Sequence, residues 1–241
     1  MSTKSARIAR PQYAEIVKLL EHLQGRHLLW QVWQDAITLI ACALSNQVDG
    51  RFREERERLY MQTIGGYSRE EAAIFPQILA EIVEQLEKDP EQDFLGDLYM
   101  QLDLGSHWAG QFFTPYSVCK MMSQINFRPV TDPEDVRPVY VNDCACGGGA
   151  TLIAAAHAFR HSIWATGLNP QHYLCFQAQD ISTVTALMCY IQLSLQGYAA
   201  KIKIGDTLAD PMTEADDGPN IWYTPMWFHP VWTVRRALAR K

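Results

Sequence analysis

Residues 137–150, RPVYVNDCACGGGA, place a short apolar stretch directly before three consecutive glycines. The residues that follow, TLIAAAHA at 151–158, are rich in alanine, a strong helix former. The sequence therefore predicts a buried strand ending at Asp143, a glycine turn and a helix. Three glycines permit positive φ angles and let a ligand approach the backbone without meeting a Cβ atom. The helix also offers unpaired N–H groups to a polar ligand. An ordinary turn needs one glycine, so a nucleotide-like ligand is favoured.

The two best-known glycine loops fit this stretch poorly. The chain contains no G-x-x-x-x-G-K-[ST] sequence, which excludes a P-loop. The glycine spacing also differs from G-x-G-x-x-G, so a site for the pyrophosphate of a dinucleotide has little support.

The loop at 143–150, DCACGGGA, resembles the D-P-A-C-G-T-G-G loop of the N6-adenine DNA methyltransferases. It is most similar to the loop in the modification subunit of type I restriction systems. Cys144, Gly148 and Ala150 depart from that pattern, but all three are small residues. The resemblance implies a loop that closes over the amino-acid end of S-adenosylmethionine.

Three further segments occur in the order that this family would have. Residues 110–115, GQFFTP, are similar to the G-Q-F-[FY]-T-P segment that lies against the methionine end of the cofactor. Asp180 would end a second strand, where a carboxylate suits the two ribose hydroxyls. Residues 205–208, GDTL, resemble the segment whose aspartate meets the adenine amino group. The cofactor-binding residues expected from these segments are Phe112, Phe113, Thr114, Pro115, Asp143, Ala145, Gly147, Gly149, Asp180 and Asp206.

The composition of the chain limits which folds and functions are possible. The chain has 241 residues with 48% hydrophobic content, enough for one α/β domain with a helical attachment. No run of 18 apolar residues exists and no apolar segment follows the basic start, so we expect neither a membrane span nor a secretory signal. The six cysteines form no C-x-x-C pair and no histidine pairs at metal spacing, so we expect a cytoplasmic protein without a metal. The net charge of −6 argues against tight DNA binding by this chain alone.

The first hundred residues are expected to be helical, with helices at 13–23, 28–44 and 75–86. The mixed charges at 51–58, RFREERER, are typical of a solvated helix face, and a phosphate contact by Arg51 or Arg53 is the alternative. We predict two regions, a helical region at 1–105 and an S-adenosylmethionine-binding domain at 106–241. In the modification subunits the helical region helps to clasp DNA and partner subunits, whereas here it could simply cap the catalytic domain.

The catalytic motif is the weakest part of the resemblance. The family binds the flipped adenine with N-P-P-[FY] just after the fourth strand, using a polar clamp and an aromatic face. This chain has no such sequence. The nearest candidate is NIWY at 220–223, which keeps Asn220 as the clamp and Tyr223 as the stacking residue but lacks the third-position proline. The alternative is a surface loop that continues into a strand.

Only 18 residues follow Tyr223, so most later strands of the usual seven-stranded sheet are not expected. The aromatic and basic residues near the end form either a surface for nucleic acid or a helix packed on the core. They are Trp227, Phe228, Trp232, Arg235, Arg236, Arg240 and Lys241.

Together these observations predict a Rossmann-like, S-adenosylmethionine-dependent methyltransferase fold with a helical N-terminal region. The first functional hypothesis is a methyltransferase that acts on N6 of adenine in DNA with little sequence specificity of its own. The second is a catalytically impaired, cofactor-binding pseudo-methyltransferase that serves as a subunit or regulator, alongside a specificity or companion subunit. A methyltransferase for RNA or protein is the third, and the segment at 110–115 argues against it.

Overall fold

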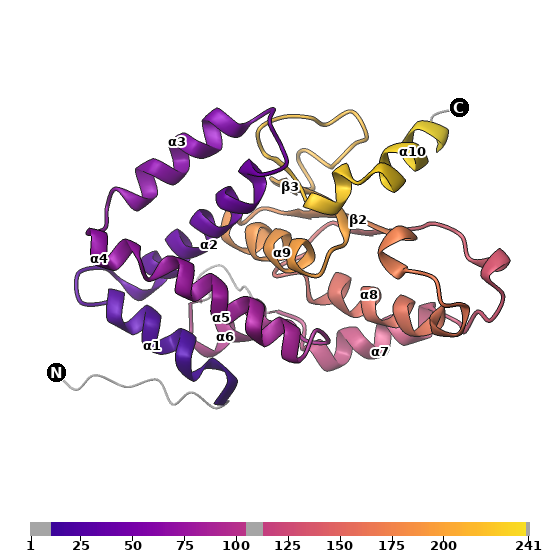
Figure 1. Ribbon diagram of the computed structural model, residues 1–241, viewed down its shortest axis with the longest axis horizontal. Helices are drawn as coiled ribbons and strands as arrows, with labels where there is room; N and C mark the ends of the chain where they lie inside the picture. Colours follow the sequence, from indigo (N-terminus) through magenta and orange to yellow (C-terminus); the bar gives the residue numbers. More distant parts are fainter. Residues whose placement is uncertain (1–10, 105–112, 240–241) are drawn as a thin grey trace.

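The computed structural model describes residues 11–104 and 113–239 (Figure 1). The N-terminal part is helical, as the sequence predicts. Its elements are η1 (Pro11–Tyr13), α1 (Ala14–Leu23), α2 (Leu29–Asn46), α3 (Arg53–Ile64), α4 (Arg69–Ala72), α5 (Phe75–Lys88) and α6 (Phe94–Gln101).

The second part alternates strands with helices. Its elements are α7 (Tyr116–Asn126), η2 (Pro133–Asp135), β1 (Val139–Asp143), α8 (Ala150–Ser162), η3 (Trp164–Thr166), η4 (Pro170–His172), β2 (Leu174–Asp180), α9 (Thr183–Leu195), β3 (Ala199–Ile204), β4 (Ile221–Tyr223), η5 (Pro225–Phe228) and α10 (Pro230–Ala239). The predicted strand ending at Asp143, the glycine turn and the helix are therefore present. The expectation that this strand is buried was wrong, because β1 lies at the edge of the sheet, none of its residues is fully buried and Tyr140 is 54% exposed.

The described residues form a four-stranded sheet in the order β1-β2-β3-β4. The first three strands are parallel, and β4 pairs antiparallel with β3. Asp143 lies beside Ala178, and Asp180 lies beside Ile204, so the carboxyl ends of β1, β2 and β3 form one edge. This arrangement of parallel strands joined by helices is a Rossmann-like α/β fold, as predicted.

Figure 1 shows α8 and α9 on one side of the strands, with α10 and the loop at 205–220 on the other. Local sequence explains why α9 is so well bounded. The Ser182 hydroxyl accepts a hydrogen bond from the Thr185 N–H at 3.4 Å and caps the first turn. Gly197 follows the helix with φ +72°, the left-handed conformation that glycine adopts most easily.

One continuous hydrophobic core joins the N-terminal helices to the α/β part. It includes Leu20 of α1, Trp33 of α2, Phe94 of α6, Phe176 of β2 and Tyr190 of α9. The predicted boundary at 105/106 lies outside the described residues. None of the helices in the described ranges combines the length and apolar character that a bilayer crossing requires.

The charged run at 51–58 differs from the prediction at one residue. Most of its side chains are exposed, but Arg56 is only 2% exposed. Its guanidinium donates to Asp49 Oδ2 at 3.1 Å and to the Ile221 carbonyl at 2.7 Å, and it lies 4.2 Å from the centre of the Trp222 ring. The run is therefore a solvated face with one buried cation that joins α3 to β4.

Polar side chains on β2 and β3 hold the loop at 205–220 against the sheet. The Gln179 amide donates to the Asp210 carbonyl and accepts from the Met212 N–H, both at 2.8 Å. Lys203, whose side chain is 3% exposed, forms ion pairs with Asp210 at 2.8 Å and Asp216 at 2.7 Å. The Lys203 ammonium group holds the pKa of Asp216 well below its usual range. These contacts explain why two adjacent strands carry buried polar residues.

Candidate cofactor site

The glycine turn lies at the carboxyl end of β1 and is tied to β2. The Cys146 N–H donates to the Gln179 carbonyl at 3.0 Å, and the Gly147 N–H donates to Asp180 Oδ2 at 2.9 Å. Asp143 Oδ1 accepts from the Ala145 N–H at 3.1 Å, which closes the start of the turn. The turn therefore has a defined shape that the sheet edge sets.

Two of the three glycines have the positive φ angles that the sequence predicts, +51° at Gly147 and +97° at Gly149. Their missing Cβ atoms make room for protein atoms. A Cβ on Gly147 would lie 3.3 Å from the Phe113 ring, and one on Gly149 would lie 3.0 Å from Cys189 Sγ. At both positions a protein side chain therefore approaches the backbone closely.

Asp180 already has partners on both carboxylate oxygens. Oδ2 accepts from Gly147, and Oδ1 accepts from the Ser182 N–H and the Thr185 hydroxyl, each at 2.9 Å. A carboxylate oxygen can accept two hydrogen bonds, so Oδ2 keeps one position for a ligand hydroxyl. Asp180 therefore connects the glycine turn to α9. It also keeps part of the hydrogen-bonding capacity that a residue binding ribose hydroxyls would need.

The segment before α7 contributes an aromatic wall. Phe113 stacks on Tyr99 of α6, with ring centres 5.5 Å apart and an angle of 21° between the planes. The same Phe113 ring lies over Gly147. Thr114 and Pro115 are exposed beside it, whereas Phe112 lies outside the described residues. The aromatic segment and the glycine turn, 34 positions apart at their contact, thus meet directly.

The fourth predicted segment also reaches this edge. The Thr207 hydroxyl donates to the Cys144 carbonyl at 2.6 Å, and the Gly205 N–H donates to the Asp180 carbonyl at 2.9 Å. Asp206 is exposed and its Oδ1 accepts from the Leu208 N–H at 2.9 Å. All the predicted cofactor segments with described residues therefore lie around the carboxyl edge of β1, β2 and β3.

The predicted catalytic residues occupy a different position from the expected one. Asn220 precedes β4 instead of following a strand, and its Nδ2 donates to the Ile204 carbonyl at 3.0 Å. Asn220 lies opposite Ile204 of β3, and Ile204 lies opposite Asp180 at the end of β2. Asn220 is therefore two strands from the end of β2, roughly 10 Å across the sheet. The amide oxygen, which the clamp would need, takes no part in the bond to Ile204.

Tyr223 lies inside β4 and is 5% exposed. The Arg51 guanidinium lies 4.6 Å from the centre of its ring, and Trp227 packs beside it with ring centres 4.9 Å apart. Arg51 is held in place by Asp49 at 2.9 Å and by Asp217. A base could stack on this face of Tyr223 only after Arg51 moves. Trp232 is fully buried against Cys175 and Ala199, so this part of the C-terminal helix packs on the core.

Sequence reasoning missed two buried polar residues beside the glycine turn, Asp93 and Gln192. Gln192 Nε2 donates to the Gly148 carbonyl at 2.8 Å and to Asp93 Oδ1 at 2.7 Å. Asp93 precedes the helix at 94–101, which is a signal for a cap, but nothing in the sequence indicates its contact with the turn. Within the described ranges, no group of three His, Cys, Asp or Glu side chains could hold a metal ion.

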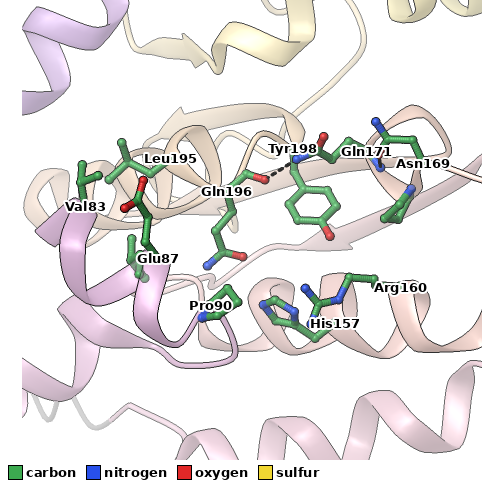
Figure 2. Close-up of a pocket in the computed structure, with 12 residues that line it drawn as sticks. Val83, Glu87, Pro90, His157, Arg160, Asn169, Gln171, Leu195, Gln196 and Tyr198 are labelled. Atoms are coloured by element: carbon green, nitrogen blue, oxygen red, sulfur yellow. Dashed lines mark hydrogen bonds between the residues drawn. The ribbon is translucent and has the colours of Figure 1, made fainter. Parts of the chain in front are cut away.

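A cavity of about 360 Å³ lies at the opposite, amino edge of the sheet. Figure 2 shows His157 and Arg160 of α8 on one wall, with the Gln196 side chain pointing toward His157 from the other. His157 is 3% exposed, and neither of its ring nitrogens has a hydrogen-bond partner among the described residues. Burial and, to a smaller extent, the nearby Arg160 guanidinium lower the pKa of His157 to about 4, although Glu91 opposes them.

The buried His157 predicts a pH dependence of stability. Its pKa is depressed from 6.5 to about 4, so between these values the unfolded chain binds more protons than the folded one. The free energy of unfolding should therefore fall by about 2–3 kcal/mol as the pH is lowered from 6.5 to 4. Urea denaturation across this range would measure the loss. His157→Phe should flatten the slope, whereas His22→Gln, at an exposed position of α1, should leave it unchanged.

Comparison with known proteins shows to which family this chain belongs. A family model described as N-6 DNA Methylase matches residues 91–233, more than half of the chain. Among solved structures, the type I restriction-modification system methyltransferase subunit from Streptococcus thermophilus is 19% identical, with a TM-score of 0.43. The similarity covers 85% of this chain and 42% of that subunit, so the chain spans less than half the length of the protein it matches. No match was found among curated proteins. On the family model, this chain belongs to the N-6 DNA methylase family.

Proposed function

We propose that this chain is an S-adenosylmethionine-dependent DNA methyltransferase that acts on N6 of adenine, with little sequence specificity of its own. One observation carries the proposal. Phe113 contacts Gly147, Gly147 bonds Asp180, and Thr207 bonds Cys144, so segments far apart in sequence meet at one sheet edge. Ligands of open α/β sheets bind outside the carboxyl ends of the strands, which is where these contacts lie.

The residues proposed to hold the cofactor divide by the group that each would contact. Phe112, Phe113, Thr114 and Pro115 would lie along the methionine end, and Asp143, Ala145, Gly147 and Gly149 would shape the turn beneath it. The free position on Asp180 Oδ2 suits a ribose hydroxyl. Asp206, which is exposed, suits the adenine amino group. When bound, S-adenosylmethionine supplies an electrophilic methyl group, and the protein contributes chiefly positioning and electrostatics.

Asn220 and Tyr223 are the proposed clamp and stacking residues for the target base. The Asn220 amide oxygen can accept from the adenine amino group, and Tyr223 offers an aromatic face once Arg51 has moved. The proposed partners are DNA and a specificity or companion subunit, and the proposed location is the cytoplasm. All six cysteines are unpaired, which is the ordinary state of thiols in that compartment.

The position of Arg51 favours a second function. It covers the Tyr223 ring and is held by Asp49 and Asp217, so the chain as described has no open stacking face at that residue. A cofactor-binding pseudo-methyltransferase that acts as a subunit or regulator would have this arrangement.

Transfer of labelled methyl groups from S-adenosylmethionine to unmethylated DNA, followed by nucleoside analysis, tests the proposal. We expect N6-methyladenine in the digest of DNA treated with the purified chain. Asn220→Ala should lower the yield at least about a hundredfold while leaving cofactor affinity unchanged. Full transfer by Asn220→Ala would exclude the clamp. No transfer by the wild-type chain, with cofactor binding intact, would support the pseudo-methyltransferase.

A further inference from the structure

The side chain of Gln192 is a buried link between three elements. It lies in α9, is completely buried, and makes three hydrogen bonds. Its Nε2 donates to the Gly148 carbonyl at 2.8 Å and to Asp93 Oδ1 at 2.7 Å, while its Oε1 accepts from the Leu95 N–H at 3.1 Å. One amide thus connects the glycine turn, α9 and the start of α6.

Asp93 completes this link from the helical region. It is 6% exposed, and its Oδ1 also accepts from the Gly96 N–H at 3.0 Å, which caps α6. Burial raises the pKa of Asp93, and the donors on Gln192 and Gly96 oppose that effect. A buried carboxylate surrounded by matched donors fixes the position of each donor, because moving any one of them leaves a polar group unsatisfied.

The backbones of the two segments also touch. A Cβ on Gly148 would lie 3.3 Å from Gly96 Cα and 3.5 Å from Asp93 Oδ1, and one on Gly96 would lie 2.0 Å from Asp93 Oδ2. A side chain at Gly148 would push against α6, and one at Gly96 would displace the Asp93 carboxylate that caps α6. The turn therefore rests on α6, with Gln192 bonded to both.

We propose that Gln192 and Asp93 are positioning residues that hold the glycine turn in its cofactor-binding conformation. The start of α6 is then part of the cofactor site, although neither side chain needs to touch the cofactor. This inference rests on the proposed function, since it assumes that the turn binds S-adenosylmethionine. It gives the helical region a role beyond covering the α/β part.

The test combines two measurements on the full chain. Amide hydrogen exchange at residues 146–150 without ligand reports the conformation of the turn, and calorimetry reports the affinity for S-adenosylmethionine. Gln192→Leu removes all three hydrogen bonds and keeps a similar volume. We expect exchange at the turn to be at least about tenfold faster and the cofactor Kd to be at least about tenfold higher. Leu20→Ala, in the core at α1, should lower stability but change neither reading.

Asp93 is tested with two variants. Asp93→Asn keeps an oxygen acceptor for Gln192 and Gly96, so its Kd should stay within about threefold of wild type, whereas Asp93→Ala should resemble Gln192→Leu. Equal losses in Asp93→Asn and Asp93→Ala would mean that the negative charge itself is needed, and would overturn the positioning role of Asp93. If Gln192→Leu behaves like Leu20→Ala in both measurements, Gln192 is an ordinary core residue. If the wild-type chain does not bind S-adenosylmethionine, the proposed function fails, while the exchange measurement still decides whether Gln192 holds the turn.

Discussion

Replacing Asp49 with alanine is expected to lower the free energy of unfolding by about 3–5 kcal/mol, because it leaves a buried cation without its partner. Asp49 is 1% exposed and Arg56 is 2% exposed, and their side chains lie 3.1 Å apart. Arg56 would keep its hydrogen bonds to Ser45 and to the Ile221 carbonyl but would lose the one carboxylate that it contacts among the described residues. Urea denaturation, read as a lower midpoint at constant slope, would measure the loss.

A double variant separates the loss of the ion pair from a general loss of packing. Replacing both partners, as Asp49→Ala with Arg56→Met, removes the unpaired buried charge and should restore part of the stability lost in Asp49→Ala. Arg58→Ala, an exposed change on the same helix, should alter stability by no more than about 0.5 kcal/mol. A double variant less stable than Asp49→Ala alone would contradict this explanation.

Gly149→Ala is expected to lower the free energy of unfolding by about 2–5 kcal/mol, from two causes that add. Its φ of +97° is unfavourable for alanine, at about 1–2 kcal/mol. The new methyl group would also lie 3.0 Å from Cys189 Sγ and 3.3 Å from Cys189 Cα, which adds an overpacking cost of about 1–3 kcal/mol. Thermal and urea denaturation of the variant would measure the sum.

Gly167 provides the matched control. Its φ is +68°, but a Cβ there would meet nothing within 4 Å, so Gly167→Ala should show the backbone cost alone. Adding Cys189→Ala to Gly149→Ala should relieve only the contact with sulphur, since the Cys189 backbone remains. Equal losses in Gly149→Ala and Gly167→Ala would show that the approach of α9 to the turn contributes nothing.

The local parts of this fold could be predicted from the sequence. The strand before Asp143, the positive φ angles of Gly147 and Gly149, and the bounds of α9 follow from turn chemistry and capping within a few residues. The order of the four segments proposed to bind the cofactor could also be recognised in the sequence, because each segment carries its own short motif. In the structure, the described parts of these segments meet at the carboxyl edge of the sheet.

The parts that were missed depend on residues distant in sequence. Arg56 belongs to a run of charges, and its burial follows from Trp222 and the Ile221 carbonyl, 165 positions away. The position of Asn220 depends on which edge of the sheet β4 joins, and three residues of strand do not specify that. The contact between Gln192 and Asp93 spans 99 positions, and no periodicity connects them. Local patterns therefore predict the segments proposed to bind the cofactor, but not the side chains that support them.

We propose above all that the turn at 143–150, together with Phe113 and Asp180, binds S-adenosylmethionine. Calorimetric titration of the purified chain with S-adenosylmethionine tests it most directly. We predict saturable binding at a single site, with Kd raised at least about tenfold by Phe113→Ala, a loss of about 1.4 kcal/mol. Absence of binding by a folded wild-type chain, or equal affinity of wild type and Phe113→Ala, would contradict the claim.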